Sequence, residues 1–307
     1  MYLCHCVVWF LLVSLQILVV DNAHSQLVTC GTVFQGTCQS RVLANIALYS
    51  TDVKPGVDRG FVAGINPSNP VVAFTAPGPL NSMGLYMYVG TDDQPSSSVY
   101  ALRSYPYGVS RRYLSGTNIF EIRTHFDGLE TFALLSEEAA TSVDFLVKYV
   151  SGFSVSNFSY FLSTQPAIYP PTSSTQRISK LSQVCHADEY FDSYVEMPIS
   201  CHGNGRNYNL VQAATVLQPG SRLASRLGVP VTEHLLVAAF YDNISDSALC
   251  VYRLSDIRQR FTENIQTCYN SEPDTLLVGR QFHGADKYCI RDLQVGPIRY
   301  NIGLLKS

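Results

Sequence analysis

The residues with the greatest capacity for chemistry lie in the segment CHADEYFDSYVEMPISC, which runs from Cys185 to Cys201. With His186 and His202, its two cysteines offer four side chains that could ligate zinc. Structural zinc sites prefer a C-x₂₋₄-C spacing, and adjacent Cys-His pairs rarely direct both ligands to one ion. A redox pair would require C-x-x-C, which is absent here. The third alternative is that each cysteine forms a disulfide with a distant part of the chain, as is usual in exported proteins.

Other catalytic patterns are missing from the sequence. It has no HExxH, GxSxG or P-loop motif, and Gly203-Asn204-Gly205 lacks the third glycine of a dinucleotide site. The acidic neighbours Asp188 and Glu189 would point to opposite faces of a strand, so they are poorly placed to share a catalytic proton. A glycosidase would need paired carboxylates facing a pocket, and no such pair is evident. The sequence predicts a protein that is not an enzyme, with no cofactor, metal or small-molecule substrate.

Composition narrows the class of protein. Hydrophobic residues make up 46% of the 307 residues, charged residues only 15%, and the net charge is −3. Nucleic-acid binding needs a basic patch, and a chain with this slightly negative net charge is not expected to bind nucleic acid. The sequons Asn157-Phe-Ser and Asn243-Ile-Ser are expected glycosylation sites of an extracellular chain.

The N-terminal 25 residues allow two interpretations. An apolar run from Val7 to Val20, followed by Ala23-His24-Ser25, resembles a secretory signal peptide with a small-x-small cleavage site. Its first residues contain no Lys or Arg, which is atypical of a signal. The alternative is that Leu18-Val19-Val20-Asp21 forms a buried strand of a fold whose first part is truncated. In that case the strand should pair beside residues 28–31.

Short strand-like runs recur along the chain and are separated by Gly, Pro, Asn and Asp. Their density predicts an all-β sandwich, barrel or propeller. Residues 144–164 form a predicted hairpin with turns near Ser151-Gly152 and Ser156-Asn157. Helical signal is sparse, and residues 256–261 are expected to form one or two turns. The predicted strands are 27–29, 71–75, 85–89, 99–102, 131–135, 145–150, 158–163, 235–241 and 248–254.

Several phrases of the sequence resemble the sema domain of plexins, the cell-surface receptors for semaphorins. The phrases SYVEMPISC and SALCVYRL are the most specific, and the order of all of them follows the family. A semaphorin's own sema domain differs around the same cysteines, so plexins are the better match. The matching phrases are LVTCGTVFQGTC (27–38), VAFTAPGP (72–79), LYMYVGT (85–91), SGFSVSNFSYFLSTQ (151–165), RISKLSQVCHADEYFDSYVEMPISC (177–201), YNLVQAATVLQPG (208–220) and SALCVYRLSDI (247–257).

The resemblance implies a disulfide pattern. In the family, the C-G-x-x-x-Q-G-x-C element closes on itself, and six later cysteines pair first with last, second with third and fourth with fifth. The family partner of Cys185 would lie just past Ser307, so Cys185 is expected to be unpaired here. The implied pairs are Cys30–Cys38, Cys201–Cys250 and Cys268–Cys289.

The resemblance also implies a fold and a function. The plexin sema domain is a seven-bladed β-propeller of four-stranded antiparallel blades. Residues 26–307 would form about four of those blades, arranged as an arc, after a signal peptide or truncated strand region at 1–25. The expected function is semaphorin binding on the extracellular side of the plasma membrane, with receptor self-association as a further expected contact. The alternative is a secreted sema protein that acts as a decoy or scaffold. Ligand contacts in the family lie on variable loops, so no contact residue is assigned.

Overall fold

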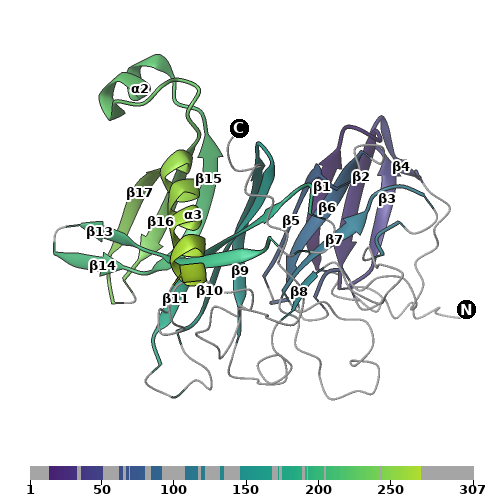
Figure 1. Ribbon diagram of the computed structural model, residues 1–307. Helices are drawn as coiled ribbons and strands as arrows, with labels where there is room; N and C mark the ends of the chain where they lie inside the picture. Colours follow the sequence, from purple (N-terminus) through teal and green to yellow (C-terminus); the bar gives the residue numbers. More distant parts are fainter. Residues whose placement is uncertain are drawn as a thin grey trace, which may run out of the picture.

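A computed structural model defines the architecture (Figure 1). Its strands form four antiparallel sheets and one separate hairpin, and in every sheet the spatial order of strands follows the chain. The structure describes residues 14–270 apart from 33–35, 51–61, 65–66, 69, 80–83, 92–107, 117–118, 122–131, 135–145, 168–171, 173–174, 189–190, 192, 204 and 243.

We number the sheets in chain order. Sheet 1 contains β1 (Leu15–Asp21), β2 (Gln26–Gly31), β3 (Cys38–Val42) and β4 (Asn45–Tyr49). Sheet 2 contains β5 (Val71–Pro77), β6 (Leu85–Thr91), β7 (Gly108–Tyr113) and β8 (Phe132–Leu134). Sheet 3 contains β9 (Lys148–Val155), β10 (Phe158–Pro166), β11 (Arg177–Cys185) and β12 (Val195–Ile199). Sheet 4 contains β15 (Leu210–Leu217), β16 (Leu235–Tyr241) and β17 (Ser247–Arg253).

The remaining elements join or follow these sheets. The separate hairpin is formed by β13 (Cys201–Gly203) and β14 (Arg206–Tyr208), between sheets 3 and 4. Helix α2 (Ser221–Leu227) lies between β15 and β16, and α3 (Leu254–Asn270) follows β17 directly. Among the described residues, no helix has the length and apolar character that a membrane span requires.

The four sheets lie face to face in chain order, with the first strand of each beside the first strand of the next. The inner strands β1, β5, β9 and β15 are therefore neighbours in that order. Three apolar clusters fill the junctions, centred on Val28 and Met87, on Tyr88 and Phe161, and on Leu162 and Phe240. This arrangement is that of consecutive propeller blades. The expected all-β propeller class is confirmed.

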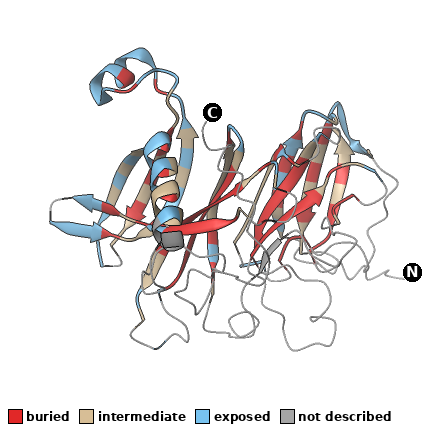
Figure 2. Ribbon diagram, viewed as in Figure 1, coloured by how far each residue is buried: buried red, intermediate tan, exposed pale blue. Residues whose placement is uncertain are grey.

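Burial along the strands shows which sheets are covered on both faces (Figure 2). In β6 and β10 nearly every residue is buried, because sheets 2 and 3 each lie between two others. In β1 and β17 exposed residues alternate with more buried ones, because a strand covered on one face buries every second side chain. Large apolar side chains therefore remain exposed on the outer faces, among them Leu18 and Val251.

The predicted hairpin is present, but only one of its two expected turns is a turn. β9 and β10 are joined at Ser156-Asn157, with Val155 opposite Phe158. Ser151-Gly152 lies instead inside β9. An added Cβ on Gly152 would lie 2.5 Å from the ring of Phe74 in sheet 2. The glycine therefore permits the close approach of two sheets, which a local pattern does not reveal.

The helical content is larger than the sequence predicts. The expected short helix at 256–261 is part of α3, which has 17 residues and packs Leu254, Ile257 and Phe261 into the core. Helix α2 was not predicted. The predicted strand at 99–102 lies outside the described residues.

The N-terminal segment is arranged as the strand alternative describes. Residues Leu15–Asp21 form β1 and pair antiparallel with β2, with Val19 opposite Val28 and Leu18 opposite Thr29. The carboxylate of Asp21 is buried and accepts hydrogen bonds from the backbone N–H groups of Ala23 and His24. Cleavage of a signal after Ser25 would remove this strand from sheet 1.

The difference between inner and outer faces leads to a stability prediction. Leu162 is fully buried between sheets 3 and 4, whereas Val251 is 46% exposed on the outer face of sheet 4. We expect Leu162→Ala to lower the free energy of unfolding by about 2–5 kcal/mol, through lost burial and a residual cavity. We expect Val251→Ala to change it by less than about 1 kcal/mol. Urea unfolding followed by circular dichroism measures both, and equal losses would contradict this packing.

Candidate functional site

The two cysteines of the segment 185–201 differ in their bonding: one forms a disulfide and the other is a free thiol. Cys201, at the start of β13, forms a disulfide with Cys250 of β17, with 5.8 Å between their Cα atoms. Cys185, at the end of β11, is a half-buried free thiol. Because the Cys201 sulfur is bonded to Cys250, it is not free to share a metal with Cys185. The imidazole of His202 is exposed and contacts the hydroxyl of Ser200 at 2.9 Å.

A second disulfide closes the loop between β2 and β3, the two central strands of sheet 1. Cys30 of β2 and Cys38 of β3 lie directly opposite each other and are bonded. The carbonyl of Gly36 in this loop accepts hydrogen bonds from the N–H groups of Val62 and Ala63, both at 2.9 Å. Gly36 has φ of +86°, and an added Cβ would lie 1.9 Å from the Ala63 carbonyl oxygen, so the element requires glycine there. Both bonds are pairs implied by the plexin resemblance, whereas Cys268–Cys289 lies outside the described side chains.

The acidic loop after Cys185 is organised by hydrogen bonds. The carboxylate of Asp188 accepts from the N–H and the hydroxyl of Ser193, at 2.6 and 2.5 Å. The Ser193 hydroxyl in turn accepts from the N–H of Cys185 at 2.9 Å. These hydrogen bonds of Asp188 hold the loop together. Glu189, the next residue and the other member of the acidic pair, lies outside the described residues. Burial raises the pKa of the Cys185 thiol, which disfavours the reactive thiolate.

His186 is a buried residue of the same loop. Its Nε2 lies 3.2 Å from the Ser154 hydroxyl and 3.1 Å from the Ser159 hydroxyl. Burial and the positive charge of Arg111 lower the pKa of His186 to about 4. The imidazole is therefore neutral near neutral pH, and its contacts with two serines join the loop to β9 and β10. His186 is only 6% exposed, so a substrate could not reach its imidazole.

Two buried arginines were not singled out by the sequence analysis. Arg111 and Arg112 are neighbours on β7, so their side chains point to opposite faces of sheet 2. Arg111 faces sheet 3, where it donates to the carbonyl of Asp188 at 2.7 Å and lies 5.0 Å from the ring centre of Phe191. Arg112 faces sheet 1 and donates to the carbonyl of Phe120 at 2.9 Å, and burial lowers its pKa to about 9. Both arginines are fully buried only because sheet 2 is covered on both sides.

The two sequons differ in what the structure shows. Asn157 lies exposed in the β9–β10 turn, and its carbonyl accepts from the N–H of His186 at 2.8 Å. Asn243 lies outside the described residues. Its neighbour Asp242 accepts backbone N–H bonds from Ile244 and Ser245.

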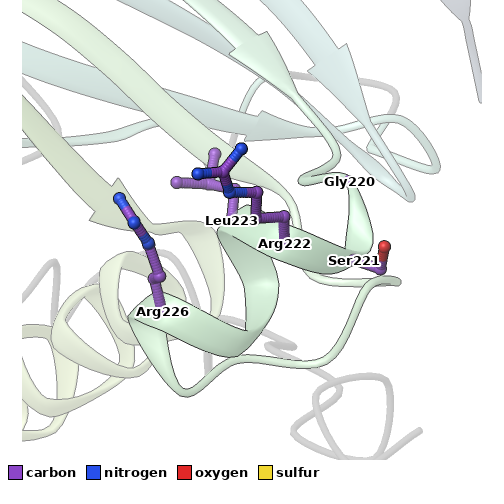
Figure 3. Close-up of a pocket in the computed structure, with 5 residues that line it drawn as sticks. All are labelled: Gly220, Ser221, Arg222, Leu223 and Arg226. Atoms are coloured by element: carbon purple, nitrogen blue, oxygen red, sulfur yellow. The ribbon is translucent and has the colours of Figure 1, made fainter.

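Shallow hollows lie on the described part of the molecule, and one of about 320 Å³ has Glu233, His234 and Arg258 in its lining. A shallow hollow of about 410 Å³ lies against α2 and is lined by Arg222, Leu223 and Arg226 with the start of the helix (Figure 3). It contains no carboxylate or histidine that could serve as a general acid or base. Within the described ranges, no three His, Cys, Asp or Glu side chains gather as metal ligands do.

Comparison with known sequences shows what the chain is similar to. The sequence model of the Sema domain family matches residues 211–297. Plexin-A4 of Mus musculus is 29% identical over 272 residues, and plexin-A3 of Homo sapiens is 28% identical over 284 residues. Each alignment covers 84% of this chain and 14% of the relative, so the chain spans about one seventh of the plexins that it matches.

Solved structures give the same result for the fold. The extracellular region of plexin A4 superposes with a TM-score of 0.69 and 27% identity, over 89% of this chain and 32% of that chain. Semaphorin 2a of Drosophila superposes with a TM-score of 0.50 and 13% identity, over 81% of this chain and 39% of that chain. The second similarity concerns the fold alone.

The cysteine arrangement predicts a specific result from peptide mapping. In oxidised protein, alkylation without reduction should label Cys185, while Cys201 and Cys250 should appear in one linked peptide. The double variant Cys201→Ser/Cys250→Ser should lose about 2–4 kcal/mol of unfolding free energy, because the bond closes a long loop. Cys185→Ser is the matched control and should cost less than about 1 kcal/mol. A linked Cys185–Cys201 peptide would show that the pairing is different.

The buried imidazole predicts a dependence of stability on pH. The pKa of His186 is lowered from 6.5 to about 4 on folding, so the unfolded chain binds the extra proton between these values. The stability from neutral His186 is present above pH 6.5 and is lost as the pH falls towards 4. We expect His186→Gln to remove about 1–2 kcal/mol of the difference between pH 7 and pH 5 in urea unfolding. The exposed control His202→Gln should leave that difference unchanged, and an unchanged difference in His186→Gln would refute the assignment.

Proposed function

We propose that this chain, which carries part of a sema domain and is related to plexins over most of its length, is the extracellular ligand-binding region of a semaphorin receptor. The observation that carries the proposal is the structural match to the plexin A4 extracellular region, which extends over 89% of this chain. That match includes sheets whose junctions and disulfides hold the strands in fixed positions.

The physical basis of such a function is a rigid scaffold that presents loops. Three filled junctions between the sheets fix the strands, and loops at the strand ends are the elements free to differ between relatives. Binding through such loops needs no reacting group, which agrees with a buried His186 and a half-buried Cys185. We therefore propose a non-catalytic role.

An extracellular or secreted location follows from the same relationship. The disulfides Cys30–Cys38 and Cys201–Cys250 persist in an oxidising compartment, and Asn157 is exposed for attachment of a glycan. We propose that residues 26–307, together with β1 of sheet 1, form a partial sema domain on the cell surface, with Asn157 and Asn243 glycosylated. Treatment of exported protein with an N-glycosidase should lower its mass, and no change would exclude both glycans.

The second candidate is a secreted sema protein that acts as a decoy or scaffold. Both candidates would bind a semaphorin. They differ in location, because a receptor stays on the cell surface whereas a decoy is released. Surface biotinylation of producing cells separates the two, because a receptor is labelled on cells whereas a decoy accumulates in the medium. A decoy should also reduce the binding of plexin extracellular regions to the same semaphorin.

The binding proposal is tested directly with purified exported chain. We expect saturable binding to at least one of a panel of semaphorin extracellular domains, with a dissociation constant of about micromolar order. Surface plasmon resonance measures it, with the plexin A4 extracellular region as the positive control and an unrelated propeller as the negative control. A folded chain that binds no semaphorin at about 100 µM would refute the proposal.

A further inference from the structure

Helix α2 stands at the tip of an excursion from sheet 4. The chain leaves β15 after Leu217 and returns at Leu235, and Figure 1 shows α2 projecting beyond the ends of these strands. Of the seven helical residues, only Ala224 is buried. We call residues 217–231 the α2 arm.

The α2 arm exposes the apolar side chains that a helix normally buries. Leu223 is 42% exposed, Leu227 is 38% exposed, and the nearby Val231 is 53% exposed. Leu217, at the base of the arm, is 37% exposed. Covering this apolar surface would release about 25 cal/mol for each square ångström removed from water. The arm therefore has a driving force for contact with another apolar surface.

The same side of the helix carries uncompensated positive charge. Arg222 and Arg226 are one turn apart, and among the described residues neither side chain makes a hydrogen bond or ion pair. Residues 210–232 contain no Asp or Glu, although the whole chain has a net charge of −3. Two like charges at this spacing destabilise a helix slightly, and an anionic partner would relieve that repulsion.

The arginines and leucines form one continuous face. At about 100° per residue, positions 222, 226, 223 and 227 fall within about 140° of the helix circumference, away from the buried Ala224. Figure 3 shows Arg222 and Arg226 extending from the same side of α2, with Leu223 beside Arg222. Between them lies the hollow of about 410 Å³, which could receive a side chain of a partner.

The arm is also held in one conformation before any contact. Gly228 ends the helix in the left-handed region at φ 63°, and the N–H of Val229 donates to the carbonyl of Ala224 at 3.0 Å. Arg253 of β17 donates to the carbonyl of Leu227 at 3.2 Å, which ties the arm to sheet 4. A preorganised surface loses little entropy on binding.

We infer that the α2 arm is a docking surface for an acidic segment of another protein, in which carboxylates meet Arg222 and Arg226 and apolar side chains cover Leu223 and Leu227. Guanidinium groups match carboxylates in a planar, bidentate geometry. A protein segment is favoured over a sulfated polysaccharide or a lipid headgroup because only the protein uses charges and leucines on the same face. This inference is independent of semaphorin binding and stands or falls separately from it.

The test uses the full 307-residue chain and a fluorescent synthetic helical peptide with two Glu and two Leu on one face. We expect saturable binding by anisotropy, weakened at least about tenfold in Arg222→Glu/Arg226→Glu and in Leu223→Ser/Leu227→Ser. Arg260→Glu, at an exposed arginine of α3, is the matched control and should bind normally. A peptide with Lys in place of Glu should recover binding to the Arg222→Glu/Arg226→Glu variant, which a merely misfolded variant would not do.

Several outcomes would overturn the inference. One is equal peptide binding by the variants and the unchanged chain, and another is failure of the Lys peptide to rescue. Absence of peptide binding to the unchanged chain would also overturn it. So would tighter binding of a heparin fragment or phosphatidylserine vesicles that is insensitive to Leu223→Ser/Leu227→Ser, since that would indicate a purely anionic ligand. Circular dichroism verifies that each variant is folded.

Discussion

Face-to-face packing of antiparallel sheets is the constraint on which the rest of this structure depends. A sheet between two others must be apolar, or internally satisfied, on both faces, and β6 and β10 meet this requirement along almost their whole length. A sheet covered on one face alternates, as β1 and β17 do. Large aromatic and aliphatic side chains fill each junction and hold the strands in place. The first and last residues of each loop are therefore also held in place.

The same packing determines how polar groups are accommodated. A buried charge is costly unless it is hydrogen-bonded. Arg111 meets this requirement with the carbonyl of Asp188 and the ring of Phe191, so it joins sheet 2 to the loop that follows β11. In that loop His186 is kept neutral and contacts two serine hydroxyls. Residues that could suggest catalysis in isolation thus act as connections between sheets.

Residue types that often carry chemistry are used differently in the interior and on the surface. The interior uses its reactive residue types for structure, since Cys201 and Cys250 are bonded and His186 is enclosed. The surface offers loops and the α2 arm, where arginines and leucines are exposed together. The similarity to plexins extends over most of the chain, so it includes the sheets as well as the loops between them.

The sequence by itself determined the fold class, the β9–β10 hairpin and the relationship to plexins, because strand periodicity and the phrases around the cysteines are local properties of the chain. It did not determine that Arg111 and Arg112 are both buried, since a strand pattern alone assigns one of two neighbours to solvent. Nor could it show that Gly152 serves sheet contact, or that α3 extends to 17 residues. These features depend on which sheet lies against which. Only the tertiary structure decides that, because the free energy of burying a side chain depends on a surface contributed by residues far away in the sequence.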